Sequence, residues 1–148
     1  MNELRWTHDQ FEEMSWHDNH VHALRIVAGD QGAGELVLDI DYIAEWLRNG
    51  DAFQFRLVPA TLRFIDVTNL RFSLDYASAS AALGPFSIHA IERRTEQRER
   101  YVAQLWRIEV NWPGGEVSFE ASGYEQSATA KAVISAHQCL SPAERDAA

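Results

Sequence analysis

The chain has 148 residues, of which 46% are hydrophobic, and it carries a formal net charge of −9 at pH 7. This length fits one domain spanning residues 1–148, with a core that needs neither a disulfide nor a metal for stability. The negative charge would repel phosphate groups, so we expect no binding to nucleic acid or to a membrane. The basic stretch of Arg93, Arg94, Arg98 and Arg100 is interleaved with three glutamates, which is typical of a solvated hairpin end.

Cys139 is the only cysteine, so the chain cannot form an internal disulfide. We find no apolar secretory segment at the N-terminus and no apolar run of about 18 residues, which is the length that crosses a bilayer. These features predict a cytoplasmic protein in a reducing compartment. Lys131 is the only lysine among 13 basic residues, and alanine is frequent, which suggests a bacterial source.

The first 14 residues are predicted to form a short helix. Thr7 and Gln10 have the spacing of a capping box, and Phe11 with Met14 gives an apolar stripe. After Trp16 the hydrophobic period changes from 3.6 to 2 residues, which indicates strands.

Two strands are predicted over residues 20–28 and 35–42, joined by a glycine-containing turn at 30–34. In the first strand the alternation puts His20, His22, Leu24 and Ile26 on one face and Val21, Ala23 and Val27 on the other. In the second, the even-numbered residues from Leu36 to Tyr42 share one face, opposite Val37, Asp39 and Asp41. Residues 43–47 could either continue this strand or form a helical turn.

Further strands are predicted on both sides of a loop at residues 77–85. Residues 53–58 alternate until Pro59, which should end that ladder or mark an edge. Residues 62–76 read as two strands with a bend near Thr68 and Asn69. Strands at 86–93 and 100–112 follow, and Pro113-Gly114-Gly115 predicts a tight turn into a strand containing Val117.

The C-terminal segment is predicted to end in a short helix, because Ser141, Pro142 and Glu144 have helix-start spacing. About eight strands at spacings near 10 residues predict a mainly β fold, on the border of α+β. We expect an antiparallel sandwich or a strongly curved half-barrel with short terminal helices.

Histidine and aspartate residues cluster near the start of the β region and are the candidate metal ligands. If the two first strands pair antiparallel, their side chains converge, and imidazole with carboxylate suits zinc, manganese, iron or nickel. A slip of one residue would separate them, and such residues also form purely structural hydrogen-bond networks in turns. The candidates are His17, Asp18, His20, His22, Asp39 and Asp41.

Other patterns that carry chemistry are weak. The sequence has no His-Glu-x-x-His helix, no glycine-rich phosphate loop and no Gly-x-Ser-x-Gly elbow, so we assign no catalytic residue and no cofactor-binding residue. Cys139 with His137 two residues before it is a weak nucleophile pair. We therefore favour a protein that is not an enzyme.

Three stretches resemble a family of bacterial proteins of roughly 150 residues with no assigned function, some of which are similar to small toxin-immunity proteins. The stretches are Trp16 to His22, Glu35 to Trp46 and Pro59 to Val67. The resemblance implies a compact β-rich fold and no catalytic residues.

Two functions follow from these observations. The first is a non-catalytic binding protein, similar to immunity proteins, whose acidic surface meets a basic protein partner. The alternative is a metal-dependent enzyme or metal-binding protein that uses the cluster between His17 and Asp41. Because a fold with many strands has sheet edges, we also expect a homodimer.

Overall fold

The computed structural model describes residues 4–77 and 82–147, and these form an antiparallel β fold with short helical segments. Its long strands are β3 (Gly34–Asn49), β4 (Ala52–Leu74), β5 (Phe86–Gln97) and β6 (Val102–Trp112). The shorter elements are β1 (Arg5–Thr7), η1 (His8–Glu13), β2 (His20–Ala28), η2 (Asp30–Gly32), β7 (Gly115–Glu120), β8 (Gly123–Ala128), β9 (Val133–Ser135) and α1 (Pro142–Ala147).

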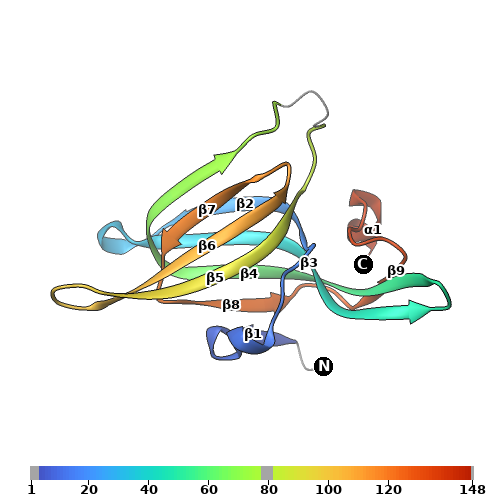
Figure 1. Cartoon of the computed structure of the whole chain (residues 1–148), viewed down its shortest axis with the longest axis horizontal. Coiled ribbons are helices and arrows are strands. Elements are labelled where there is room, and N and C mark those ends of the chain that lie inside the picture. Colours follow the sequence, from blue (N-terminus) through green and yellow to red (C-terminus); the bar gives the residue numbers. More distant parts are fainter. Residues whose placement is uncertain (1–3, 78–81, 148) are drawn as a thin grey trace.

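The sheet curves until it closes on itself. Its order is β1-β8-β4-β3-β2-β5-β6-β7, and β7 also pairs with the end of β4, so six strands form a partly closed ring (Figure 1). The long strand β4 makes this possible, because different parts of it pair with β9, β3, β8 and β7. The prediction of a mainly β, antiparallel and strongly curved fold is confirmed.

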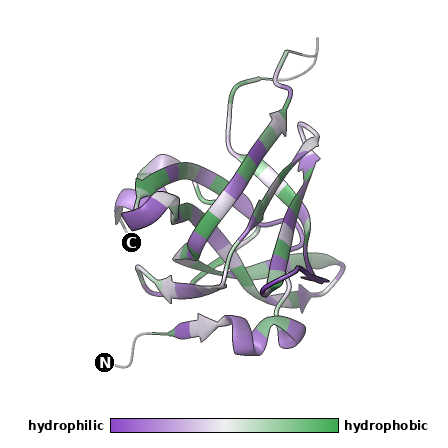
Figure 2. Cartoon of the chain, turned by 90° about the vertical axis from the view of Figure 1, so that its left-hand side faces the viewer, coloured by the Kyte–Doolittle hydropathy of each residue, from purple (hydrophilic) through white to green (hydrophobic). Residues whose placement is uncertain are grey.

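The core fills the inside of this ring. Leu36, Leu38 and Ile40 of β3 point inward and are completely buried, as the alternation of the sequence predicts. Trp106 of β6 lies among aromatic rings, with its centroid 5.3 Å from that of Phe64. Along the strands, hydrophobic and hydrophilic positions alternate visibly (Figure 2). The sheet is therefore two-sided, and polar side chains share its outer face with a small second core of Ile43, Phe55, Leu57 and Leu140.

The N-terminal prediction is partly wrong. Residues Arg5–Thr7 form strand β1, which pairs with β8, before the short 3-10 helix η1 begins. The capping box is present, because the Thr7 side chain and the Gln10 side chain each accept a backbone hydrogen bond. Pairing with β8 satisfies the backbone hydrogen-bonding groups of Arg5–Thr7. The residues around Arg5–Thr7 give no sign of this strand, because its partner lies more than a hundred positions later in the chain.

Pro59 does not end a strand, which corrects the prediction. It lies inside β4 and pairs with Asp41 of β3, and its carbonyl accepts from the Thr129 N–H. In an antiparallel strand the N–H and the C=O of one residue point to the same neighbouring strand. The N–H that proline lacks would therefore point, like the Pro59 carbonyl, to the side of β4 where β8 ends at Ala128. Pro59 therefore leaves out only the return bond to Thr129, which lies beyond the last residue of β8. Residues 43–47 continue β3 as a strand.

The faces of β2 are shifted by a β-bulge, which also corrects the prediction. Val21 pairs with Ile40, and the next regular pair is Ala23 with Asp39, so His22 is the extra residue. As a result both Val21 and Leu24 pack in the core, although alternation alone places them on opposite faces.

The predicted bend near Thr68 and Asn69 corresponds to a register shift between Thr68 and Arg71. The tight turn at Gly114 and Gly115 and the short C-terminal helix are confirmed. Of the predicted loop at 77–85, residues 78–81 lie outside the described part. Strands β8 and β9 were not predicted. Among the described residues, no helix has the length and apolar character to cross a membrane.

Candidate functional site

Asp41 is the centre of the candidate site. It lies on β3 between the inward-facing Ile40 and Tyr42, so its side chain points to the outer face of the sheet. The residue is nevertheless 0% exposed. A buried carboxylate requires charged or hydrogen-bonding partners, and these come from β2 and from the C-terminal segment.

His22 supplies the first partner. Its Nε2 atom lies 2.7 Å from Asp41 Oδ2. An ionised carboxylate only accepts hydrogen bonds, so Nε2 carries the proton in this contact. His22 follows the core-facing Val21, so alternation turns it to the outer face that Asp41 shares, and the bulge leaves it without a pairing partner on β3.

The C-terminal segment, residues 138–147, supplies the remaining partners. The Leu140 N–H donates to Asp41 Oδ2 at 2.8 Å, and Arg145 donates to Asp41 Oδ1. The Arg145 guanidinium also contacts Asp39 Oδ1 at 3.2 Å. Cys139 Sγ lies 3.6 Å from His22 Nε2. Leu140 packs in a small second core with Ile43, Phe55 and Leu57. The segment is thus fastened by polar contacts and by one buried leucine.

These contacts change the ionisation of the groups. Burial by itself would raise the pKa of the Asp41 carboxyl, but the hydrogen bonds from His22 and the Leu140 N–H lower it below its ordinary value. Burial, with the Asp41 charge nearby, raises the pKa of the Cys139 thiol to about 11. Burial lowers the pKa of His20, so this imidazole is neutral at pH 7. The site therefore has an ionised carboxylate beside a protonated thiol.

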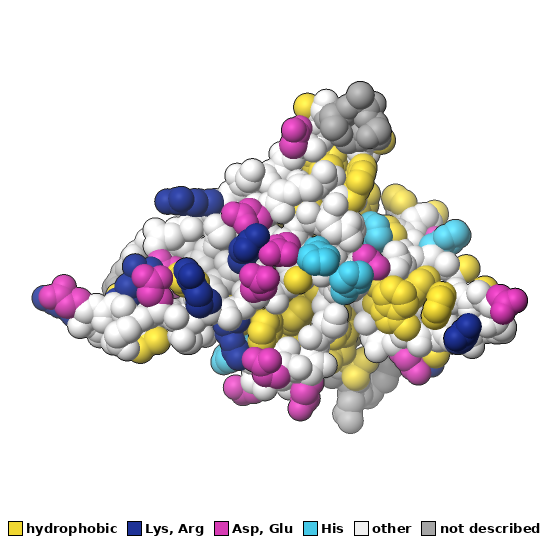
Figure 3. All heavy atoms as spheres, viewed as in Figure 1, with side chains coloured by type: hydrophobic (Ala, Val, Ile, Leu, Met, Phe, Trp, Pro, Cys, Tyr) yellow, Lys and Arg dark blue, Asp and Glu magenta, His cyan; other side chains and the backbone are white. Residues whose placement is uncertain are grey.

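A second group of polar residues lies close to the C-terminal segment. Asp18 Oδ2 accepts from Gln138 at 3.0 Å, and Asp18 Oδ1 accepts from Asn111 at 3.0 Å. His17 Nδ1 lies 3.2 Å from Asp18 Oδ2, and the His17 and His89 rings are 5.5 Å apart. Figure 3 shows histidine side chains gathered at the middle of this face, with acidic side chains beside them.

The six candidate metal ligands proposed from the sequence therefore do not form one cluster in the structure but fall into separate groups. The structure joins His22 and Asp41 directly, and it joins Asp39 to Asp41 through Arg145. His20 is the register partner of Asp41 but does not belong to the donor atoms that lie within 4.8 Å of one another. His17 and Asp18 pair separately. Sequence reasoning missed the contributions of Cys139 and Arg145, because no local pattern connects them with β3.

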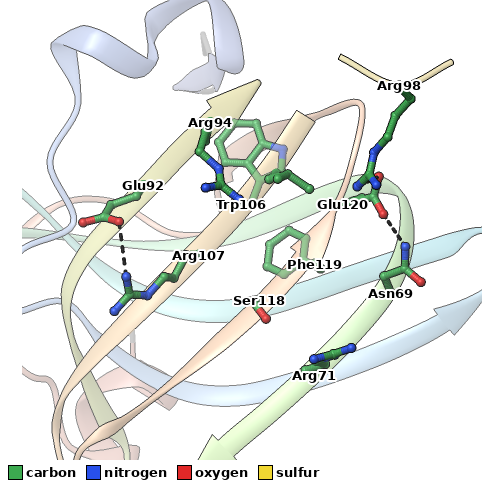
Figure 4. A pocket seen from close by; sticks show the side chains of 11 residues that line it. Asn69, Arg71, Glu92, Arg94, Arg98, Trp106, Arg107, Ser118, Phe119 and Glu120 are labelled. Atoms are coloured by element: carbon green, nitrogen blue, oxygen red, sulfur yellow. Dashed lines mark hydrogen bonds and ion pairs between the residues drawn. The ribbon is translucent and has the colours of Figure 1, made fainter. Parts of the chain in front are cut away.

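A groove of about 670 Å³ lies over β5, β6, β7 and the end of β4 and is the other candidate site (Figure 4). Its residues come from cross-strand rows: Glu92, Arg107, Ser118 and Arg71 follow one another across the four strands. The lining also includes Arg94, Arg98, Asn69, Leu105 and Glu120, and the buried Trp106 and Phe119.

The groove carries charges of both signs, with four arginines and two glutamates in its lining. Arg107 lies 3.7 Å from Glu92, 3.0 Å from Glu109 and 2.5 Å from Glu116, so carboxylates surround it. Asn69 donates a hydrogen bond to Glu120. Within the described part of the chain, Arg71 takes part in no ion pair. The predicted hairpin end is present, since β5 ends at Gln97 and β6 begins at Val102, but the prediction did not include the groove that forms where β5 meets β6 and β7.

Comparisons with known proteins give no relative: no family model, no curated protein and no solved structure matches this chain.

Proposed function

We propose that the protein is a non-catalytic binding protein, and that the groove over β4–β7 is its surface for a protein partner. The observation that carries this proposal is the ordered array of arginine and glutamate side chains that lines the groove. Arrays of both signs contribute specificity and register to protein interfaces more than raw affinity. The groove selects a partner by its pattern of charges.

The charges of the groove define this partner. Arg71 is free of ion pairs with described residues, and the Arg94 side chain is 77% exposed with Glu96 at 3.9 Å, so both can approach an acidic side chain of a partner. Glu92, whose side chain is 55% exposed, would receive a basic side chain. A nucleic acid or an anionic membrane is disfavoured by the net charge of −9 of the whole chain and not by the groove, whose lining holds four arginines and two glutamates. The net charge of −9 favours encounter with a basic partner, as in the immunity-like function.

The alternative of a metal-dependent enzyme is less well supported. An enzyme needs its reactive groups to line a concave site that holds the substrate. The groove is lined by none of the six candidate His and Asp residues. Without a metal, Asp41 accepts hydrogen bonds from three donors and lies outside the groove, so it is poorly placed to act as a general base on a substrate there.

The test compares two charge reversals. Arg71→Glu changes the groove, whereas Arg25→Glu makes the same charge change at an exposed residue of β2 that does not line it. Immobilised wild-type protein and both variants are used to capture partners from a lysate of the source organism, and titration calorimetry then measures the affinity of the purified partner. We expect wild type and Arg25→Glu to bind alike, and Arg71→Glu to bind at least about tenfold more weakly, which corresponds to about 1.4 kcal/mol.

A partner that binds Arg71→Glu as tightly as wild type would contradict the groove as the binding surface. Failure to retain any protein would contradict the proposed function as a whole. A toxin gene beside the gene for this chain would support the immunity-like form.

A further inference from the structure

We propose that His22, Asp41 and Cys139 form a zinc site that fastens the C-terminal segment to the outer face of β2 and β3. This inference goes beyond the proposed function, because the three residues lie outside the groove. His22 Nε2, a carboxylate oxygen of Asp41 and Cys139 Sγ all lie within 4.8 Å of one another. They come from β2, β3 and the C-terminal segment, so one ion would join three distant parts of the chain.

The distances between these atoms fit zinc. A tetrahedral zinc ion, with bonds of about 2.0–2.1 Å to nitrogen and about 2.3 Å to sulfur, holds these two atoms about 3.6 Å apart. The observed separation of His22 Nε2 and Cys139 Sγ is 3.6 Å. Nitrogen and oxygen ligands would be about 3.4 Å apart. The contact of 2.7 Å between His22 and Asp41 therefore has to open by less than about 1 Å when zinc replaces the bridging proton.

The arrangement of the three groups favours a cation over a simple hydrogen-bond network. Asp41 Oδ2 and Cys139 Sγ both approach His22 Nε2, which offers only one proton. A cation at their meeting point would satisfy all three donor atoms together. A nitrogen, an oxygen and a sulfur ligand suit zinc, whereas magnesium and calcium take oxygen ligands.

The surroundings would hold these ligands in place. The Leu140 N–H and Arg145 both donate to Asp41, which fixes the carboxylate as outer partners of metal ligands do. Zinc binding releases the Cys139 thiol proton to solvent and requires His22 to be neutral with its Nε2 atom unprotonated. The positive charges of the ion and of Arg145 then equal the negative charges of Asp39, Asp41 and the Cys139 thiolate. The group as a whole is then neutral. The His22 side chain is 13% exposed, so the site lies near the surface and an ion can reach it.

The test uses the whole chain without a metal-binding tag, in the presence of a phosphine reductant. Zinc content is measured after dialysis against a competing chelator, and cobalt serves as a spectroscopic probe for the thiolate ligand. The variants are Cys139→Ser and His22→Gln. The matched controls are His137→Ala and His17→Ala, which remove histidines near the site that are not members of the triad.

We expect one zinc per wild-type chain and a thiolate-to-cobalt charge-transfer band. Outer partners alone change metal affinity by about 10- to 100-fold, so loss of Cys139 or His22 should weaken binding by at least about 100-fold. The two controls should bind as wild type does. Zinc should also slow proteolytic cleavage after Arg145 in wild type and leave Cys139→Ser unchanged.

Three results would overturn the proposal: wild type without zinc, a cobalt complex without the charge-transfer band, or controls that lose as much affinity as the triad variants. The first two measurements use wild type alone, so they decide the matter even if a variant fails to fold. The groove variant Arg71→Glu should keep its zinc, which separates this proposal from the binding function.

Discussion

Replacement of Asp41 by asparagine tests how much the buried carboxylate contributes to stability. The change keeps the shape of the side chain and removes its charge. Asp41 is 0% exposed and accepts from His22, Leu140 and Arg145. An asparagine offers one acceptor oxygen in place of two, so its NH₂ group would face a donor that has lost its partner.

The magnitude follows from two opposing facts. Breaking a buried ion pair costs about 3–5 kcal/mol, and an unsatisfied buried group alone costs about 1–3 kcal/mol. The Arg145 side chain is 15% exposed and keeps some contact with water, which reduces the penalty. We therefore expect a loss of about 2–4 kcal/mol for Asp41→Asn.

The assay is urea unfolding followed by tryptophan fluorescence, with a chelator present so that only the metal-free protein is measured. For a slope of about 2 kcal/mol per molar urea, the midpoint should fall by about 1–2 M. The control is Asp39→Asn, whose side chain is 45% exposed and contacts Arg145 only at the rim. This exposed pair should contribute at most about 1 kcal/mol.

If the C-terminal segment detaches by itself in Asp41→Asn, the free energy of global unfolding changes less than the lost contacts would imply. A second measurement therefore follows the segment directly. The Leu140 amide donates to Asp41, and its hydrogen exchange reports release of this segment. We expect exchange at Leu140 to become faster in Asp41→Asn. An unchanged midpoint together with unchanged exchange would refute the reasoning, as would equal losses for Asp41→Asn and Asp39→Asn.

Three further predictions concern the fold. Gly115→Ala should lose about 2 kcal/mol or more, because its Cβ would clash with the Ser73 carbonyl oxygen. Gly114→Ala meets nothing within 4 Å and should lose only the strain of its positive φ, about 1 kcal/mol. Equal losses in urea unfolding would contradict this. Trp106→Ala should lose about 3–5 kcal/mol by the same assay, and a loss below about 2 kcal/mol would mean that the interior collapses around the gap. Light scattering at micromolar concentration should return the mass of a homodimer. The reason is that β2 pairs with β3 only as far as Asp41, so the rest of this edge of β3, next to the exposed Trp46, is open to a second copy of the chain. A particle of 16.8 kDa would disprove this prediction.

Local sequence patterns determined the strands and many of their faces. The alternation from Leu36 to Tyr42 fixes which side chains face the core, because side chains on a strand point to opposite faces in turn. The turn at Gly114 and Gly115 follows equally from local chemistry, since both residues have positive φ angles. The curved antiparallel fold could be predicted from the number and spacing of such runs.

Contacts between distant segments decided the rest. The bulge at His22 depends on pairing with β3, and the passage of β4 through Pro59 depends on where β8 ends. The sequence could suggest that His22 and Asp41 meet, because their strands are neighbours in the chain. It gave no indication that Cys139 and Arg145 join them, since these residues lie about a hundred positions away and only the docking of the C-terminal segment brings them to β3. Register and docking are settled by the balance of many non-local contacts, and no short window of residues contains that information.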